Sequence, residues 1–343
     1  MANNLTTQLK IFHEERPARL ADFVELMFPQ KRVFDSEKIP VDQLLPTGAL
    51  AGYRNKGAPS NILKYNAGTG FVGVPPIIAV KTSVNEELAG AVTVGMEANA
   101  PANQQLLQKY VYIQQQHEDA VYTTIAKQAA DILLTGKFTP VDDKNNPVDT
   151  GPIDFGRDSS LTVSGAYGAD PVKQIADTYK PLKKFGVPTA GLFAIVGSDV
   201  MGLLQKNEDF MNLLKLQGLN AGKNWVSPDN RVVGTIIKNT MVPGAAVPMT
   251  IISFDEGYSD SAGAWTPFIP PKAVVISSFS SPRFACYGGV FIVENKDGRI
   301  YAGDIVTDKY MQKDPDQLVL RTQSRPLLLP ANINHTACST STN

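Results

Sequence analysis

The feature that most constrains the fold is an uninterrupted stretch of helix-compatible sequence, residues 101–135. After Pro101, which suits the first position of a helix, neither glycine nor proline occurs until Gly136. Apolar side chains recur mostly three or four residues apart, or at multiples of that spacing: Leu106, Tyr110, Ile113, Val121, Ile125 and Ile132. At about 1.5 Å per residue such a helix spans roughly 50 Å, more than a compact domain of this size needs. We therefore predict one long helix that acts as a spine for the rest of the chain.

Composition limits the classes of protein to which the chain can belong. Its 343 residues are 43% hydrophobic, enough for a sizeable core, and at ~150 residues per domain they predict two domains. The formal net charge is −1, so the chain lacks the overall basic excess by which a protein wraps nucleic acid. The two cysteines, Cys286 and Cys338, do not make a disulfide framework, and no apolar run reaches the ~20 residues that span a bilayer. We expect an intracellular protein with neither a signal peptide nor a membrane span.

The residues before the spine helix divide into a short helix and a long extended segment. Between Leu20 and Phe34, apolar residues at helical spacing predict an amphipathic helix that ends at Pro29. From Ile39 to Val94, glycine and proline recur among β-branched and aromatic residues, which excludes a helix and predicts an extended β-arm. A two-stranded arm is marginally stable alone, so we expect it to rest on something else.

The residues after the spine helix alternate between helical and strand-like patterns. A hairpin is predicted over 138–155 with its turn at 142–147. A helix is then predicted over 170–185, capped by Asp170, stopped by Gly186 and expected to kink or break near Pro181. A second helix is predicted from a Ser198 cap to about residue 216. The predicted strands are 192–196, 232–238, 249–254, 273–278, 291–293 and 318–329. This order indicates a mixed sheet, and the polar tail after Asn332 is expected to fray.

One glycine pattern resembles a cofactor loop. Gly68, Gly70 and Gly73 match the dinucleotide fingerprint G-x-G-x-x-G, whose mechanism needs a helix to begin at this turn. Val74-Pro75-Pro76 follows instead, and a residue before proline is disfavoured in the helical region. We interpret the motif as a β-loop, and an NAD-binding oxidoreductase stays as the alternative from another functional class.

No other pattern indicates catalysis, a metal or a cofactor. His117-Glu118 begins the zinc motif H-E-x-x-H, but position 121 is valine, so His117 is interpreted as a polar or subunit-contact residue on the spine. We expect His13 and His335 to be solvated in terminal arms and Cys286 to be a packing residue. The remaining candidates are read as solvated turns or faces: Asp142-Asp143, Asp255-Glu256, and Lys180, Lys183 and Lys184. The predicted catalytic, cofactor-binding and metal-binding residues are therefore none.

Three segments resemble a known family. Residues 133–158 (LLTGKFTPVDDKNNPVDTGPIDFGRD), 281–288 (SPRFACYG) and 321–329 (RTQSRPLLL) are similar to the post-spine hairpin, a segment before the last β elements, and the closing strand of the lambda-type major capsid proteins of tailed bacteriophages (major capsid protein E). The order of the parts along the chain also resembles this family, whose α+β fold is the Hong Kong 97 capsid fold.

The resemblance implies a division of the chain into five parts. They are an N-terminal arm over 1–38, an E-loop over 39–94, a P-domain over 95–186 with spine helix 101–135 and hairpin 137–156, an A-domain over 187–280, and a β return with the C-terminal tail over 281–343. The E-loop would lie across a neighbouring subunit's spine and hairpin. The A-domain loops 220–230 and 256–266 would face the centres of hexamers and pentamers.

The resemblance also implies a function and a set of partners. The chain would be the major head protein of the virion, not an enzyme, and would assemble in the host cytoplasm into an icosahedral shell that encloses double-stranded DNA without reading its sequence. A scaffolding protein, supplied separately because the chain starts directly with the N-terminal arm, and a portal are expected partners, with a decoration protein as a third candidate. Crosslinking through Lys56 or Lys64 is not inferred, since nothing marks an acidic catalyst beside them. An encapsulin-like compartment shell, which has the same fold, is the second alternative.

Overall fold

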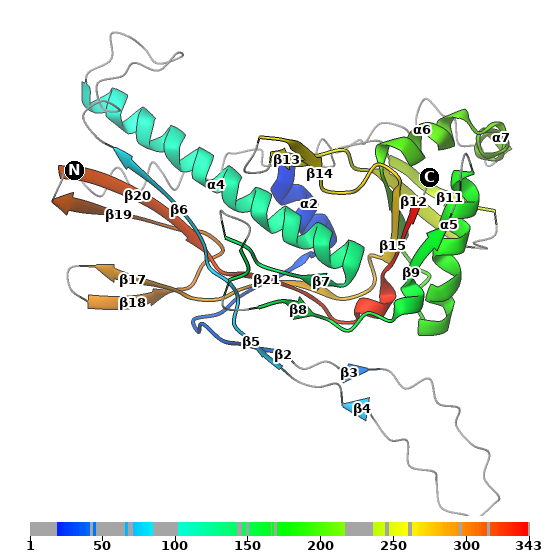
Figure 1. The fold of residues 1–343 in the computed structure, drawn as a ribbon, viewed down its shortest axis with the longest axis horizontal. Coiled ribbons are helices and arrows are strands. Elements are labelled where there is room, and N and C mark those ends of the chain that lie inside the picture. The colour runs from blue at the N-terminus through cyan, green and yellow to red at the C-terminus, as the bar shows by residue number, and fades with distance from the viewer. Residues whose placement is uncertain are drawn as a thin grey trace, which may run out of the picture.

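The computed structural model describes residues 19–41, 44–45, 66–67, 71–84, 102–142, 146–148, 151–165, 167, 170–216, 236–243, 247–259, 263–294, 297–313 and 316–341. A long helix, α4 (Ala102–Thr135), connects two regions rich in strands (Figure 1). Its bounds agree with the predicted spine to within one residue. The helix ends because Gly136 has a φ of 74°, a left-handed conformation that glycine adopts without a steric cost.

A mixed sheet of six strands forms one end of the molecule. Its order is β11-β12-β10-β15-β22-β9. The strands are β9 (Thr162–Gly165), β10 (Leu192–Val196), β11 (Ile236–Met241), β12 (Pro248–Ser253), β15 (Ala273–Ser278) and β22 (Ala337–Ser341). Strand β10 runs parallel to β12 and antiparallel to β15, and β22 runs parallel to β9. The predicted mixed sheet is confirmed, and the predicted strand 273–278 agrees with β15 at both ends.

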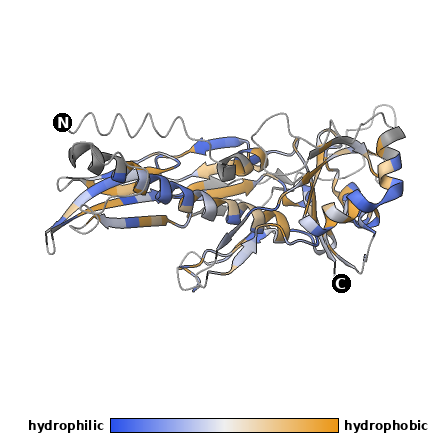
Figure 2. Cartoon of the chain, turned by 90° about the horizontal axis from the view of Figure 1, so that it is seen from above, coloured by the Kyte–Doolittle hydropathy of each residue, from blue (hydrophilic) through white to orange (hydrophobic). Residues whose placement is uncertain are grey.

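The two faces of this sheet have different cores, because side chains alternate along a strand. Ala194, Val196 and Val274 face a cluster that also contains residues of the helices α5 (Pro171–Tyr179), α6 (Ser198–Lys206) and α7 (Glu208–Leu216). Phe193, Ile195 and Val275 face the opposite cluster, which contains the spine helix. Figure 2 shows apolar strands at this end, with hydrophilic residues on the surrounding helices. The central strands β10 and β15 are therefore buried on both faces.

The first helix at this end forms as its sequence predicts. The Asp170 carboxylate accepts a hydrogen bond from the Lys173 backbone N–H at 2.9 Å, and Pro171 occupies the first turn. At Lys180–Phe185, the segment that contains Pro181, the α-helix gives way to the tighter 3-10 helix η2. Gly186 then ends it with a φ of 65°. The predicted break near Pro181 is confirmed.

The second predicted helix differs from its prediction in two ways. Its N-cap is Gly197, without a side-chain hydrogen bond, and Ser198 is the first helical residue. The segment is also two helices, α6 and α7, because Asn207 leaves the helical conformation and caps the next helix through a 2.9 Å bond from the Phe210 N–H to its side chain. Asparagine competes for backbone groups in this way, which periodicity does not detect.

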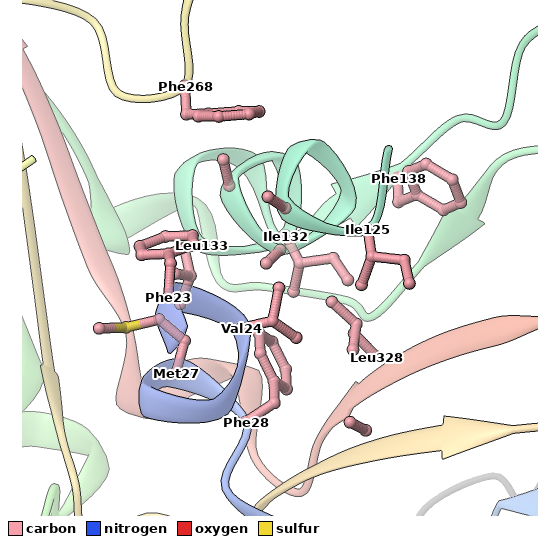
Figure 3. Close-up of a cluster of buried hydrophobic side chains, with 14 of the residues drawn as sticks. Phe23, Val24, Met27, Phe28, Ile125, Ile132, Leu133, Phe138, Phe268 and Leu328 are labelled. Carbon is pink, nitrogen blue, oxygen red and sulfur yellow. The ribbon is translucent and has the colours of Figure 1, made fainter. Parts of the chain in front are cut away.

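The second half of the spine helix packs into the largest core. The helix α2 (Arg19–Met27) lies against it and contributes Phe23, Val24 and Met27, and Phe28 follows directly, so the amphipathic helix predicted before Pro29 is confirmed (Figure 3). The spine contributes Ile125, Ile132 and Leu133 to the same cluster. Burial of each such side chain stabilises the fold by about 1.5–3 kcal/mol. This core therefore joins the spine to the N-terminal helix and to the six-stranded sheet.

The remaining strands form small sheets around the spine. The first is β1-β16-β21, with β1 (Gln30–Val33), β16 (Arg283–Tyr287) and β21 (Pro326–Pro330). The second is β19-β20-β6, with β6 (Ile78–Val84), β19 (Val306–Lys313) and β20 (Asp316–Ser324). Two-stranded antiparallel pairs are β2 (Ile39–Val41) with β5 (Phe71–Gly73), β3 (Leu44–Leu45) with β4 (Asn66–Ala67), β7 (Lys137–Phe138) with β8 (Ile153–Asp154), β13 (Gly257–Ser259) with β14 (Trp265–Pro267), and β17 (Val290–Glu294) with β18 (Asp297–Tyr301). The hairpin predicted after the spine is confirmed by β7 and β8.

The C-terminal tail contradicts the prediction that it frays. After a short 3-10 helix, η3 (Ile333–His335), the strand β22 enters the six-stranded sheet between β15 and β9. Ala337, Cys338 and Ser339 are buried there. The composition of the tail is polar, but its backbone pairs on both sides, and backbone pairing does not depend on apolar side chains.

Candidate functional site

The described residues contain no group of three or more histidine, cysteine, aspartate or glutamate side chains that could hold a metal ion. Both cysteines are buried as free thiols, and burial raises the pKa of Cys286 and of Cys338 to about 11 each. A thiol with a raised pKa is a poor nucleophile at neutral pH. The packing interpretation of Cys286 is confirmed. None of the helices in this part of the chain is long and apolar enough to cross a membrane.

His117 lies on the spine helix and is only 3% exposed. Its Nε2 is 2.7 Å from the Thr82 hydroxyl on β6, and its Nδ1 is 3.3 Å from the Thr322 hydroxyl on β20. The histidine is therefore a polar residue of the spine, as predicted, but its contacts are within the chain. The subunit-contact interpretation of this side chain is not supported.

His335 corrects a second expectation, since it is partly buried and both of its ring nitrogens have partners within the chain. The Ser281 hydroxyl lies 3.0 Å from Nδ1 and the Asn332 side chain 3.0 Å from Nε2. Burial lowers the pKa of His335, and a backbone hydrogen bond raises it by a smaller amount. Ser281 lies in the connection from β15 to β16, and His335 lies in the connection from β21 to β22. The ring thus joins the two places where the chain passes between the six-stranded sheet and the sheet beside the spine. His13 lies outside the described residues.

The remaining polar candidates that the structure describes are exposed or partly exposed. Lys180 pairs with Asp177 at 2.5 Å and is 65% exposed, as expected of a solvated face. Asp142 accepts a hydrogen bond from the Asn146 N–H at 2.7 Å, in the hairpin turn predicted there. Asp143 and the loop 220–230 lie outside the described residues. The second proposed A-domain loop, 256–266, includes most of the hairpin β13–β14.

The structure does not support a dinucleotide loop. Gly68 and Gly70 lie outside the described residues, and Gly73 is in β5, where it pairs with Ile39 of β2. Residues 74–77 are extended or irregular and lead into β6, so no helix begins between residues 71 and 84. A pyrophosphate needs the N-terminal amides of a helix at this place.

The segment that contains this motif is instead the base of an arm. Strand β2 pairs antiparallel with β5, and further along the arm β3 pairs with β4. Figure 1 shows both pairs leaving the body below the spine, with β3 and β4 farther out. The chain therefore leaves at Ile39 and returns at Gly73 as a ribbon. This position is typical of an element that contacts another molecule, because so small a pair is marginally stable alone.

A second candidate contact surface is the hairpin β17–β18. Val290 and Ile292 point inward and are buried, whereas Phe291, Val293 and Ile300 on the other face are 52%, 62% and 48% exposed. Phe291 and Ile300 are cross-strand partners, so their side chains are neighbours on that face. An outward apolar face of this kind is typical of a protein–protein contact.

A family model and two solved structures that match this chain are all described as phage or prophage capsid proteins. The family model for phage major capsid protein E matches residues 8–340. A prophage protein of Escherichia coli CFT073, described as a capsid protein, is 16% identical and superposes with a TM-score of 0.64, covering 98% of each chain. The mature capsid of bacteriophage PhiM1 gives 14% identity and a TM-score of 0.51, covering 92% of this chain and 85% of that one.

Two other comparisons add little. An encapsulin of Synechococcus elongatus PCC 7942 gives 8% identity and a TM-score of 0.43, covering 91% of this chain and 84% of that one, which is too low to favour an encapsulin. Among curated proteins, none matches this chain.

Proposed function

The chain belongs to the phage major capsid protein E family, and we propose that it assembles with copies of itself into the icosahedral head of a tailed bacteriophage around double-stranded DNA. The sequence resemblance predicted this family, an α+β fold of the Hong Kong 97 type and a capsid function, and all three are confirmed. The family is one of structural proteins. The observation that carries the proposal is the match of the family model over nearly the whole chain.

The assembly contacts follow from the two protruding elements. The arm that begins at β2 and returns at β5 lies across a neighbouring subunit's spine and hairpin, where its unpaired backbone groups find partners. Many modest contacts of this kind in a closed shell combine into strong retention. The apolar outward face of β17–β18 is the second surface in contact with other copies.

We keep the five-part division of the chain as a proposal. Residues 1–38 are the N-terminal arm, 39–94 the E-loop, 95–186 the P-domain, 187–280 the A-domain, and 281–343 the β return and tail. The core that α4 shares with α2 supports a P-domain built on the spine. The strands β10, β11, β12 and β15 with the helices α6 and α7, all within 187–280, support an A-domain. The A-domain loops at 220–230 and 256–266 face the centres of hexamers and pentamers.

Further partners and the place of assembly belong to the same proposal. A scaffolding protein and a portal take part in assembly in the host cytoplasm, and a decoration protein is a further candidate. The net charge of −1 lets packaged DNA fill the shell without strong attachment to the wall. The chain itself catalyses no reaction and needs no cofactor.

The arm is tested by replacing residues 46–65, which connect β3 to β4, with a short glycine-serine linker. We expect a folded protein that no longer forms closed shells, because the segment that reaches the neighbour is gone. Negative-stain electron microscopy of the purified protein, with and without a candidate scaffolding protein, measures assembly.

The control for that experiment is the fold of the variant itself. Circular dichroism and thermal melting of the variant should match those of the full chain, since the variant keeps every residue that the structure describes. Normal particles from the shortened arm contradict the proposed role of the arm, and absence of shells from the unaltered chain under all scaffold conditions contradicts the capsid assembly itself.

A further inference from the structure

The spine helix rests on two different kinds of surface. Its second half packs into the large core through Val121, Ile125, Ile132 and Leu133. Its first half lies over the sheet β19-β20-β6 (Figure 1), where the buried apolar cluster consists of Val84, Ile113 and Leu320, with Tyr110 packed against it. Among the side chains that the structure describes, which on this helix begin at Lys109, the first half therefore has much less apolar burial than the second.

His117 lies between these two halves and connects the helix to the sheet by hydrogen bonds. Its two ring nitrogens contact the hydroxyls of Thr82 on β6, at 2.7 Å, and Thr322 on β20, at 3.3 Å. Thr322 in turn lies 3.3 Å from the hydroxyl of Thr307 on β19. The imidazole thus joins the spine to β6 and β20 directly, and to β19 through Thr322.

The hydrogen bonds suit a neutral ring. A neutral imidazole has one donor and one acceptor nitrogen, and a hydroxyl can fill either role. Protonation turns both nitrogens into donors, so one threonine hydroxyl must rotate and give up its former hydrogen bond. The new charge would be buried at a ring whose two hydrogen-bond partners are hydroxyls, which stabilise it less than a carboxylate does.

Burial sets the direction in which the pKa of His117 shifts, and the charged groups around the ring act against it or lie on the far face. On the spine, Glu118 is buried and accepts a hydrogen bond from Gln114 at 2.9 Å. On the strands, Lys81 and Arg321 are cross-strand partners on the face away from Thr322, with Arg321 held by Asp308 on β19, whereas Lys309 is in register with Leu320 on the spine side. Burial lowers the pKa of His117, and Glu118 raises it by a smaller amount.

We propose that His117 is a pH-sensitive latch, whose protonation releases the first half of the spine helix from the sheet β19-β20-β6 while the second half stays packed. The latch is separate from the proposed assembly contacts between subunits, because all of its contacts lie within one chain. The pKa of His117 in the latched form lies below the ordinary value of 6.5. The latched form therefore has its full stability above pH 6.5 and loses stability as the pH falls below that value.

The test is hydrogen exchange of the full chain, measured by mass spectrometry at pH 7.5 and at pH 5.5 and corrected for the intrinsic pH dependence of exchange. We expect exchange in residues 102–118 to speed up by as much as about tenfold for each pH unit below 6.5, the ratio by which one pH unit shifts a one-proton equilibrium. Residues 121–135 should change little. A uniform change along α4, or none, overturns the proposal.

The variant His117→Gln separates titration from packing. Glutamine keeps both a donor group and an acceptor but does not titrate, so the pH response of residues 102–118 should disappear. The matched control is His335→Gln, which removes the other described histidine with a lowered pKa and should leave that response intact. A response that survives in His117→Gln, or vanishes in His335→Gln, contradicts the latch.

A measurement on the unaltered protein covers the case in which His117→Gln does not fold. Nuclear magnetic resonance titration of the His117 ring should give a pKa below 6.5, and a value at or above 6.5 overturns the proposal. Thr82→Val, which keeps the shape but removes a hydroxyl, should speed exchange in residues 102–118 already at pH 7.5. Unchanged exchange in Thr82→Val also overturns it.

Discussion

Arg283, in the strand after β15, is the largest of the fully buried side chains among the described residues. It donates hydrogen bonds of 3.2 Å to the Ser277 hydroxyl and to the Ser278 carbonyl, and its guanidinium lies 5.1 Å from the centre of the Phe193 ring. Its Nε has no partner in this part of the chain, and burial lowers the pKa of Arg283 to about 10. Dipoles and an aromatic face, rather than a carboxylate, stabilise this buried cation.

This environment predicts that the charge of Arg283 costs stability while its volume contributes to it. Arg283→Met, which fills most of the space without a charge, should melt at or above the temperature of the unaltered chain, since replacing a buried charge by a well-packed apolar residue is often neutral or stabilising by about 1–4 kcal/mol. Arg283→Ala should lose about 2–4 kcal/mol through the cavity it leaves. Thermal melting compares the two, and a methionine variant as unstable as the alanine variant shows that the hydrogen bonds outweigh the burial cost.

At the scale of single elements, the spine helix shows how one end of a helix is held. The Gly136 N–H bonds to the Ile132 carbonyl at 2.9 Å, and Arg157 donates to the Leu133 carbonyl at 2.9 Å and to the Leu134 carbonyl. The positive charge of Arg157 also interacts favourably with the negative end of the helix dipole and stabilises the helix. A Cβ at Gly136 would lie 2.6 Å from the Arg157 Cβ, so the glycine admits both the left-handed turn and the arginine.

The continuity of the spine is tested at Ala120, an exposed position between its two halves. Ala120→Pro should destabilise the protein by about 3 kcal/mol or more, because proline removes a backbone hydrogen bond and clashes with the preceding turn. Ala120→Gly, the matched control, should cost only about 1 kcal/mol. Chemical denaturation measures the free energy of unfolding of both variants. Equal losses mean that the backbone hydrogen bond at residue 120 does not stabilise the helix.

At the scale of the whole molecule, segments far apart in sequence complete each other's sheets. The C-terminal strand β22 joins β15 to β9, which follows the spine hairpin, and β21 pairs with β16. The spine core includes residues from α2 near one end of the chain to Cys338 near the other. The chain therefore cannot complete either large core until its last strand is in place.

That dependence predicts the effect of a small truncation. Removal of residues 337–343 should abolish cooperative melting or yield insoluble protein, because β15 and β9 lose their shared neighbour and Thr178 and Gln174 lose their bonds to Ser339. Removal of residues 342–343 alone, which leaves β22 whole, is the control and should be neutral. Soluble, cooperatively folded protein without β22 contradicts a central role for this strand.

The sequence by itself determined the elements whose cause is local. The bounds of α4, the Asp170 cap, the break near Pro181 and the strand β15 follow from apolar periodicity and from the conformational limits of glycine and proline. The family followed from three short segments whose residues are unusual enough to recognise. The negative conclusion about the glycine motif was also local, since two prolines exclude the helix that a dinucleotide needs.

Only the tertiary structure decided what depends on distant partners. The tail was expected to fray because its side chains are polar, yet β22 is held by backbone pairing with two strands that the sequence does not connect to it. His335 was expected to be solvated and His117 to be a polar or subunit-contact residue, but the structure gives each ring a hydroxyl partner from a segment 35 to 205 residues away. Burial and backbone pairing are properties of the assembled fold, so a polar residue takes its role from neighbours that local sequence does not reveal.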